Sequence, residues 1–581
     1  MSDKATTSFM RSLCMGQIEQ DVLFPFPTMP DEQKALLHEI SSALADLLGS
    51  RSEEFRQWDA AGDMPAEFID ELKEFGLFSL IIPEEFGGME LGNMAYSRTL
   101  QEVGRYDASV AVTIGAHSSI GMRGLLLFGS DEQKARYMPQ LATGEMIAAF
   151  CLTEPGAGSD AAAIKTTAVR QGDEWILNGT KLWITNGGFA DFFTVFARTG
   201  AEGEHGKMTA FIVTRDMAGV STGPHEDKMG LRASSTTTVL FDDVHVPAEN
   251  VLGEIGLGFK VAMQILNSGR TGLGGGSVGA MKHLIEASTK QANERKTFGQ
   301  PISSYGLIKE KIGQMVVDCY TSEAVVTMVG GLVDAGYEEY AVEAAISKVY
   351  STECLARAAD EALQIAGGNG FMREYPYERI VRDCRINRIF EGTNEILRLF
   401  IALTAINDVS SQLKDLAAFM KGKLNDPIKG FGVLSDWTRK QAKLKTGRGG
   451  SAAKLEGLDE SIQPQVEIFE KKTRNLAQAT DRILRKHGKN IIGKQFATKR
   501  LADIMIDLFV MACTLSRVQA SIDANGLEKA QQEIEILQVF TREARIRIKR
   551  NFRRIDNNED ELLKALAVDA FEVERYRWDT I

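Results

Sequence analysis

The spacing of apolar residues changes twice along this chain, and no other sequence feature restricts its fold as strongly. From about residue 30 to about residue 145, apolar side chains such as Leu37, Ile40 and Leu44 recur every three or four positions, which is the period of an amphipathic helix. The helical period returns at about residue 258 and continues to about residue 405. Between these parts lie short β-rich runs bounded by Gly and Asp, at residues 174–178, 192–197, 208–213 and 236–241. The sequence therefore predicts an α+β protein, mostly α, with a compact β domain between helical parts.

The chain continues well beyond this pattern. A linker-like stretch has a flexible Gly-rich centre at residues 445–451, and helical spacing resumes from about residue 464. Residues 411–454 carry ten Lys or Arg against three Asp, around a narrow apolar stripe and Trp437. Cationic residues beside such a stripe are typical of a helix at a membrane surface. This segment is a candidate peripheral membrane contact, and the alternative is a helix packed against the C-terminal domain.

Composition excludes several classes of protein. The net charge of −12 argues against nucleic-acid binding. Six Cys without a C-x-x-C pair indicate reduced thiols, and seven scattered His show no metal-ligand spacing, so we expect no metal. No apolar run approaches the roughly 18 residues of a membrane span. The first residues, Met1 to Lys4, are typical neither of a signal peptide nor of an Arg-rich transit sequence.

Glu391 is the candidate catalytic residue. It stands alone between Phe390 and the flexible Gly392, after an apolar-rich helical pattern. A carboxylate in apolar surroundings has a raised pKa and is a stronger base than one in water. The alternative is an ordinary glutamate at a helix end.

Two further runs suggest a ligand site. Residues 150–160 form a strand-like run broken by a Pro/Gly turn, and residues 182–188 follow about 20 residues later. Hydroxyls alternate with apolar and aromatic residues in both runs, which suits a flat, half-apolar ligand such as a flavin ring. Each run alone is more typical of a turn beside a strand.

Two other patterns are set aside. Residues 272–277 look like a dinucleotide fingerprint, but neither a strand nor a βαβ unit accompanies them. The basic run at residues 545–554 predicts a solvated helix face or ion-pair partners.

Taken together, these runs resemble the acyl-CoA dehydrogenase family over residues ~15–405. The closest likeness is to the very-long-chain subgroup, through residues 16–27 and the long C-terminal extension. The motifs are F-C-L-T-E-P-G-A-G-S-D at 150–160, L-W-I-T-N-G-G at 182–188, E-R-K-T-F-G at 294–299, Q-I-A-G-G-N-G-F at 364–371 and E-G-T-N-E-I-L-R at 391–398.

The resemblance implies α,β-dehydrogenation of a long-chain fatty acyl-CoA, the first step of β-oxidation, with FAD as cofactor. Glu391 matches the family's base, which takes the α-proton while the β-hydride passes to flavin N5. It also implies the family's architecture, the acyl-CoA dehydrogenase fold. The domains expected are an N-terminal helical domain (1–147), a middle β domain (148–257), a C-terminal four-helix bundle (258–405), a basic amphipathic linker (406–462) and an extra helical domain (463–581).

The resemblance also assigns the cofactor contacts. Some of the matched residues reach the FAD of a neighbouring subunit, which implies at least a homodimer, or a dimer of dimers. The positions that match FAD contacts within the subunit are Phe150, Leu152, Thr153, Gly158, Ser159, Trp183, Thr185, Thr393 and Glu395. Those that match contacts to the neighbouring subunit's FAD are Arg295, Thr297, Phe298, Gln364 and Gly368.

Substrate contacts are expected at Ser159 and Arg270, which match positions near the bound acyl-CoA. Some relatives place the base at the position of Gly269, which has no carboxylate here, so Glu391 is the base assigned. Glu395 departs from many relatives, which have a neutral or shorter residue, and a carboxylate there would repel a pyrophosphate. Ala111 and Gly115 lie four apart on one helix face, where small residues leave room for a long acyl tail or allow close helix packing.

The resemblance further implies electron-transfer flavoprotein as the electron acceptor. The alternatives are an acyl-CoA oxidase that uses oxygen and a non-catalytic role in respiratory-complex assembly. The expected location is the bacterial cytoplasm, or the mitochondrial matrix if a presequence was removed. Peripheral attachment to the inner membrane is a further expectation.

Overall fold

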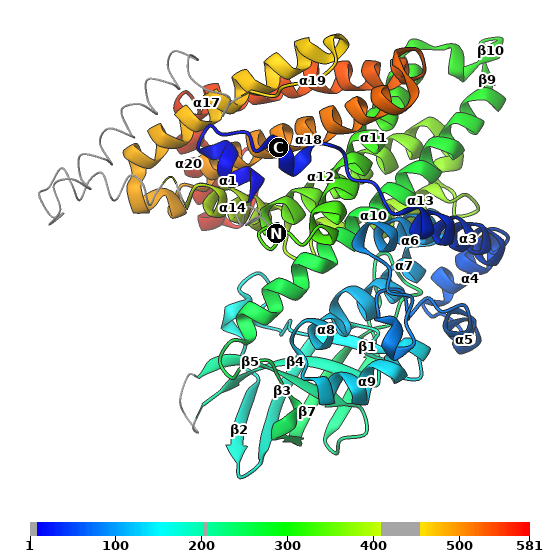
Figure 1. The fold of residues 1–581 in the computed structure, drawn as a ribbon, viewed down its shortest axis with the longest axis vertical. Helices are drawn as coiled ribbons and strands as arrows, with labels where there is room; N and C mark the ends of the chain where they lie inside the picture. Colours follow the sequence, from blue (N-terminus) through cyan, green and yellow to red (C-terminus); the bar gives the residue numbers. More distant parts are fainter. Residues whose placement is uncertain (1–7, 201–205, 408, 410–453, 581) are drawn as a thin grey trace, which may run out of the picture. The chain divides into compact units, whose positions relative to one another are not determined.

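A computed structural model describes residues 8–200, 206–407, 409 and 454–580 (Figure 1). The described residues divide into two compact units. The first comprises residues 26–396, and the second comprises residues 8–25 and 397–580. Each has its own core. The α+β class expected from the sequence is confirmed.

The first unit begins with helices, because its apolar residues repeat with the helical period. Leu44 and Leu48 of α3, Phe55 of α4 and Leu72 of α5 all point into one core. The helices are α3 (Asp31–Leu48), α4 (Ser52–Ala61), α5 (Ala66–Glu74), α6 (Asn93–Tyr106), α7 (Ala108–Gly115), α8 (Arg123–Phe128) and α9 (Asp131–Thr143), with a π-helical turn η2 (Ala116–Gly121) between α7 and α8.

A mixed sheet of eight strands follows in the order β6-β7-β3-β2-β4-β5-β8, and β1 pairs in parallel with β4. Its core is made of alternating inward residues such as Phe193, Val195 and Phe211. The strands are β1 (Ala148–Cys151), β2 (Thr167–Gln171), β3 (Glu174–Thr185), β4 (Phe192–Thr199), β5 (Lys207–Thr214), β6 (Val220–His225), β7 (Thr236–Pro247) and β8 (Val251–Leu252). The four strands expected from the sequence are confirmed.

Long helices complete the first unit, and α10 runs from the sheet into the bundle (Figure 1). The elements are α10 (Gly258–Glu294), the hairpin β9 (Lys296–Thr297) and β10 (Gln300–Pro301), α11 (Gly306–Asp334), α12 (Ala341–Ala366), the turn η6 (Gly367–Phe371), α13 (Tyr377–Arg385) and the start of α14 (Asn394–Ala405), which belongs to the second unit from Leu397 onward. The Gly-rich run 272–277 lies inside α10, where a Cβ on Gly275 would be 2.5 Å from the Ser97 carbonyl oxygen of α6. The run lies within a helix and does not follow a strand, which is why the dinucleotide fingerprint was set aside, and Gly275 allows close helix packing.

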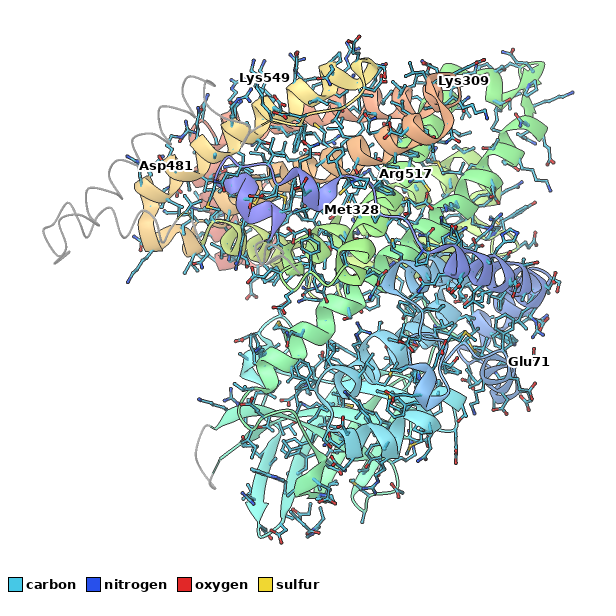
Figure 2. All side chains as sticks on the ribbon, viewed as in Figure 1. Glu71, Lys309, Met328, Asp481, Arg517 and Lys549 are labelled. Atoms are coloured by element: carbon cyan, nitrogen blue, oxygen red, sulfur yellow. The ribbon has the colours of Figure 1, made fainter. Side chains whose placement is uncertain are left out.

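The second unit packs two N-terminal helices, α1 (Phe9–Cys14) and α2 (Gln20–Leu23), with α17 (Gln463–His487), α18 (Gln495–Asn525), α19 (Leu527–Asp556) and α20 (Asp560–Val573). Phe9 of α1 lies 6.2 Å from Phe509 of α18, ring to ring. The basic run on α19 behaves as expected: Arg547 pairs with Asp507 at 2.7 Å, and Lys549 is exposed (Figure 2). Residues 8–25 thus pack with the C-terminal helices, although the sequence places them in the N-terminal helical domain.

Two long apolar helical segments lie in the core of the protein. Among the described residues, two helical segments have the length and mean hydropathy of a span, at residues 108–128 and Gly306–Asp334. Of their most apolar windows, 61% and 72% is buried inside the protein, and Met328 of α11 is one such core residue (Figure 2). Both segments are therefore core helices whose apolar faces are covered by neighbouring elements. Polar residues interrupt both segments, so neither is a continuous apolar run of span length.

Candidate functional site

Glu391 occupies a sharp bend between α13 and α14. Its φ is +54° and that of Gly392 is +92°, so two consecutive residues adopt the left-handed conformation. A non-glycine residue in this region costs on the order of 1–3 kcal/mol and persists only where the surroundings hold it. Such strain gathers at functional sites, and Glu391 shares it with seven other non-glycine residues in the described part of the chain, Trp183 and Phe298 among them.

The Glu391 carboxylate faces α10. A Cβ built on Gly269 would lie 2.9 Å from Glu391 Oε1, so glycine is needed there for the carboxylate to fit. Glu391 Oε2 is buried and accepts no hydrogen bond from the residues that the structure describes. Burial raises the pKa of Glu391 to about 7, although the charges of Lys348 and Arg270 act in the opposite direction. The raised pKa expected from the sequence is confirmed, and a carboxylate that titrates near neutral pH suits general-base chemistry.

Two cations stand near this carboxylate. Arg270 of α10 is buried and donates through Nη1 to Asn267 Oδ1 at 2.8 Å. Burial lowers the pKa of Arg270 to about 10, and the Glu391 charge partly offsets this. The second cation is Lys348 of α12, which the sequence reading missed. A lone lysine in a helical pattern looks like a solvated residue, and only the fold shows that it is buried.

On the β side, Trp183 and Thr185 lie at the C-terminal end of strand β3. The pairing of β3 with β7 shifts register between Lys181 and Ile184, and Trp183 has a φ of +58°. Its side chain is 61% exposed, although it is large and aromatic. Thr185 is half-buried opposite Thr236. A strained backbone that presents an uncovered indole is a second mark of a ligand site.

The segment from Phe150 to Thr153 lies beside this strand and is held by hydrogen bonds from it. Leu182 N–H donates to the Thr153 carbonyl at 2.9 Å, and Lys181 Nζ donates to the Leu152 carbonyl at 3.2 Å. Lys181 is fully buried and also pairs with Glu154 at 2.7 Å. Phe150 packs edge-on against Phe196 in the core. Gly158 and Ser159, by contrast, are exposed on the turn that follows.

The π-helical turn η2 brings the two sides together. Ala148 N–H of β1 donates to His117 Nδ1 of η2 at 3.0 Å, and Asn186 Nδ2 after β3 donates to the Thr113 carbonyl at 3.0 Å. On its other side, Ile120 Cγ2 would lie 2.8 Å from a Cβ on Gly269, beside Glu391. Residues next to the segments 150–153 and 183–185 therefore contact α7 and η2, and η2 also approaches Gly269, which faces Glu391.

The other predicted contacts lie elsewhere. Arg295, Thr297 and Phe298 lie on or beside the β9–β10 hairpin, and Gln364 and Gly368 lie at the end of α12. Both sets belong to the same end of the bundle, because Lys311 near the start of α11 pairs with Glu361 of α12. Along α10, Arg295 is 26 residues beyond Gly269, which corresponds to about 39 Å. The structure does not bring these residues to Glu391 within one chain.

Thr393 and Glu395 follow the bend directly. Thr393 Oγ1 accepts a hydrogen bond from Ile396 N–H at 3.2 Å, so the hydroxyl caps the first turn of α14. Glu395 is exposed. A capping role accounts for Thr393 without any ligand.

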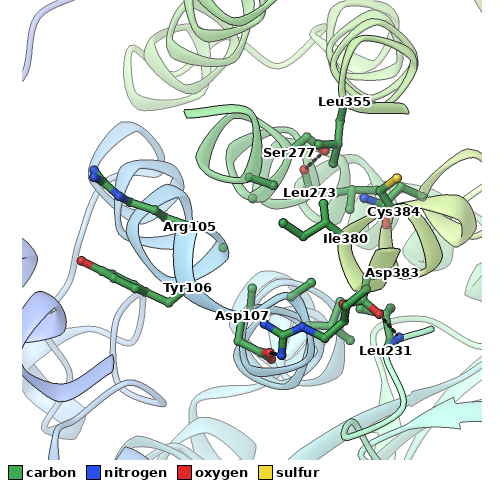
Figure 3. A pocket seen from close by; sticks show the side chains of 18 residues that line it. Arg105, Tyr106, Asp107, Leu231, Leu273, Ser277, Leu355, Ile380, Asp383 and Cys384 are labelled. Atoms are coloured by element: carbon green, nitrogen blue, oxygen red, sulfur yellow. Dashed lines mark hydrogen bonds and ion pairs between the residues drawn. The ribbon is translucent and has the colours of Figure 1, made fainter. Parts of the chain in front are cut away.

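A cavity of about 60 Å³ borders α7, α10 and α13 (Figure 3). Ala111 is among its lining residues, together with Leu273, Ile380 and Cys384. Gly115 does not line it, and a Cβ there would meet only Ser119 Oγ at 3.9 Å. Of the two residues expected at the acyl tail, the structure places Ala111 alone at a cavity.

Comparisons with known proteins agree along the chain. Family models match as follows: acyl-CoA dehydrogenase N-terminal domain at residues 30–145, middle domain at 149–244, C-terminal domain at 256–406, and the ACAD9/ACADV C-terminal domain at 460–576. The chain is similar to the human mitochondrial very long-chain specific acyl-CoA dehydrogenase, with 42% identity over 98% of this chain and 86% of that one. A probable acyl-CoA dehydrogenase of Bacillus subtilis is 38% identical over 81% of this chain and 78% of that one.

Among solved structures, an acyl-CoA dehydrogenase complexed with FAD from Bacillus anthracis is similar, with a TM-score of 0.82 and 35% identity. The match covers 97% of this chain and 95% of that one. Similarity over nearly the full length includes both units and the C-terminal extension.

Proposed function

The chain belongs to the acyl-CoA dehydrogenase family, and from this premise we propose that it oxidises long-chain fatty acyl-CoA to trans-2-enoyl-CoA with FAD. The observation that carries the proposal is the Glu391 carboxylate. It has a buried oxygen without a partner in the described part of the chain, and its pKa is about 7. No neighbouring side chain uses that oxygen, so it is available to take a proton from a substrate.

The chemistry needs a base and a donor. The α-proton of a thioester is a weak acid, so its removal requires a base of high proton affinity and a hydrogen bond to the developing enolate oxygen. We assign the base to Glu391 Oε2, and we assign the donor to the backbone N–H of the same residue, as the resemblance implies. FAD, when bound, supplies the acceptor for the β-hydride. Arg270 and Lys348 stabilise the carboxylate form in which Glu391 can act.

The residues of the β side fit a flavin. The Trp183 indole is exposed on a left-handed backbone, and Thr185 stands two residues further on. A Cβ built on Gly158 would meet no atom within 4 Å, so the turn leaves space at this point. A planar ligand that covers the indole and accepts hydrogen bonds at its edge would satisfy these groups.

A complete site requires a second subunit. The hairpin residues lie about 39 Å along α10 from the level of Glu391, which is farther than one FAD extends. Phe298 is 97% exposed at the hairpin tip and also has a positive φ. We infer that the hairpin and the end of α12 contact the FAD of a partner subunit in a homodimer. The same arrangement repeated would give a dimer of dimers.

The acyl tail is assigned to the cavity at Ala111. Its α10 lining begins at Leu273 and ends at Ala280, roughly 6 and 16 Å along the helix from Gly269. A tail that starts at Glu391 and follows α10 reaches the near end of this cavity with few carbons, and it reaches the far end only if it is long. The cavity is smaller than the roughly 150 Å³ that holds a benzene molecule, so it suits the last few carbons of a tail.

The physiological setting follows from the relatives. We propose electron-transfer flavoprotein as the electron acceptor on the family resemblance. The relatives include mitochondrial and bacterial proteins, so the mitochondrial matrix and the bacterial cytoplasm are both consistent with them. The candidate membrane segment 411–454 lies outside the described residues, apart from Lys454 at its end. Its proposed role therefore rests on its sequence alone.

Anaerobic mixing of the FAD-loaded protein with palmitoyl-CoA tests this function. We expect the flavin absorbance to bleach and the reduced protein to reoxidise slowly in air. Rapid reoxidation would identify an oxidase. A protein that binds FAD and is not bleached by any acyl-CoA would contradict the proposal and favour a role in complex assembly.

A further inference from the structure

Lys348 is a fully buried lysine whose ammonium points at the turn that carries Glu391. Its Nζ donates to the Gly392 carbonyl at 2.9 Å and to Asn394 Oδ1 at 2.9 Å. Burying an ammonium group is costly unless it is paired and hydrogen-bonded. In this protein its partners are the residues immediately after Glu391, so the cost is tied to the conformation of this turn.

Asn394 extends the connection to a second point on α12. Its Nδ2 donates to Thr352 Oγ1 and to Glu353 Oε1, both at 3.1 Å. Lys348 and Thr352 are four residues apart and share one helix face. The turn with φ of +54° and +92° is therefore held to α12 by hydrogen bonds at two positions, Lys348 and Thr352. These hydrogen bonds offset the cost of the unfavourable backbone conformation of Glu391.

We propose that Lys348 is a positioning residue for the Glu391 base: it clamps the 391–394 turn to α12 and places a positive charge beside the carboxylate. This inference rests on the proposed function and adds a residue to it. Two consequences follow. The clamp aims the carboxylate, and the charge favours its ionised form.

The charges around the pair determine the sign of the pH effect. Glu391 is faced by Lys348 of α12 and Arg270 of α10, and both lower its pKa against the effect of burial. Tyr96 of α6 also faces it, since the Glu391 charge contributes to the raised pKa of that phenol. Lys348 is in turn faced by Arg270 and by the carboxylates Glu353 and Glu395, and burial lowers its own pKa to about 8. Removing Lys348 therefore takes away one of two cations, and the pKa of Glu391 rises.

The test compares variants of the full-length, FAD-loaded protein in single-turnover bleaching by palmitoyl-CoA across pH. Lys348→Met keeps the length of the side chain and removes its charge. We expect at least about a tenfold slower rate at pH 7 and an acid limb moved up by about one pH unit. Asn394→Ala loosens the clamp and keeps the charge, so the rate should fall while the acid limb stays in place.

Lys282→Met is the matched control. Lys282 is a half-buried lysine of α10 that pairs with Glu323 at 2.5 Å, and it lies 13 residues beyond Gly269, about 20 Å along the helix. Its loss should lower thermal stability without changing the rate or the acid limb. An identical pH shift in Lys282→Met would overturn the proposal, because the shift would then be a general effect of losing a lysine. A Lys348→Met protein with the wild-type rate and acid limb would overturn it as well.

If Lys348→Met does not retain FAD, Asn394→Ala decides alone: a lowered rate supports the clamp, and a rate within twofold of wild type refutes it. Glu391→Gln separates this inference from the function on which it rests. Bleaching of Glu391→Gln at the wild-type rate would remove the proposed function itself. An inactive Glu391→Gln beside a normal Lys348→Met would remove only the role of Lys348.

Discussion

Glu391 shows how a reactive carboxylate reduces stability. Its pKa is raised from 4.5 to about 7 in the folded protein, so between these values the folded state binds more protons than the unfolded state. Stability therefore falls as pH rises through this window and stays lower above it. The unfavourable φ of +54° adds a second local cost. The raised pKa and the strained backbone both lower stability, and both are explained if Glu391 acts as a catalytic base.

Replacing Glu391 with Gln tests both sides of this relation. The amide cannot accept the α-proton, so we expect a folded, yellow protein that binds acyl-CoA and does not bleach. At pH 8 it should be more stable than wild type by on the order of 1 kcal/mol, and the gain should disappear below about pH 4.5. Thermal unfolding at the two pH values measures this. Turnover above about 10% of wild type would identify another residue as the base.

The residues that could be found from sequence differ from those that could not in a physical way. Glu391, Trp183 and Thr185 belong to short runs whose composition is unusual in itself. Lys348 carries no such signal, because a lysine within a helical pattern is ordinary, and Gly269 is noticed only through the resemblance to the family. Their importance comes from contacts across the bundle with a turn far away in sequence, and only the packed structure creates those contacts.

At the scale of elements, α10 separates two functions. Its middle part, from Gly269 to Ala280, faces Glu391 and the cavity at Ala111, and the β9–β10 hairpin follows its end. The helical period of this region was readable from sequence, and the division of the predicted FAD contacts into two groups came only from the resemblance to the family. The order of residues in the sequence does not show that a single helix, α10, separates Gly269 from Arg295.

Ala111→Leu tests the tail assignment. The larger side chain fills the cavity, and each buried methylene that it displaces from the substrate is worth about 0.8 kcal/mol. We expect the preferred acyl chain to become shorter by a few carbons in a kcat/KM profile over chain length. Gly115→Ala is the control, because a Cβ there meets nothing closer than 3.9 Å. A profile shifted by Gly115→Ala and unchanged by Ala111→Leu would place the tail along another path.

The hairpin makes its own prediction. Phe298→Ser leaves the chain's own core intact, since 97% of this side chain is exposed. We expect the protein to fold normally but to lose FAD and dissociate on dilution, measured by the flavin-to-protein absorbance ratio and by light scattering. Ile546→Ser on α19, where the side chain is 64% exposed, should change neither. Unchanged FAD content and size in Phe298→Ser would contradict the shared site.

At the scale of the whole molecule, the chain folds into two units, and the second of them combines two distant parts of the sequence, residues 8–25 and 397–580. The change from helical to strand spacing and back was enough to predict the α–β–α order, because each period reports one buried face. The partnership of residues 8–25 with the C-terminal helices was not predictable in this way. Phe9, Met10 and Leu13 are a single short apolar cluster, and periodicity does not say which of two cores will cover it.

Leu13→Ala tests this partnership. Leu13 is fully buried in α1, and truncating such a residue costs roughly 2–5 kcal/mol because a cavity remains. The loss should fall on the second unit, so limited proteolysis should cut more readily within α17, α18 and α19, while bleaching by palmitoyl-CoA per bound flavin is retained. Leu44→Ala is the counterpart in α3 of the first unit, with the same change at an equally buried site. It should instead expose the segment from α3 to α6. If Leu13→Ala increased cleavage in α3 to α6 and left the C-terminal helices protected, residues 8–25 would belong with the N-terminal helices and not with the second unit.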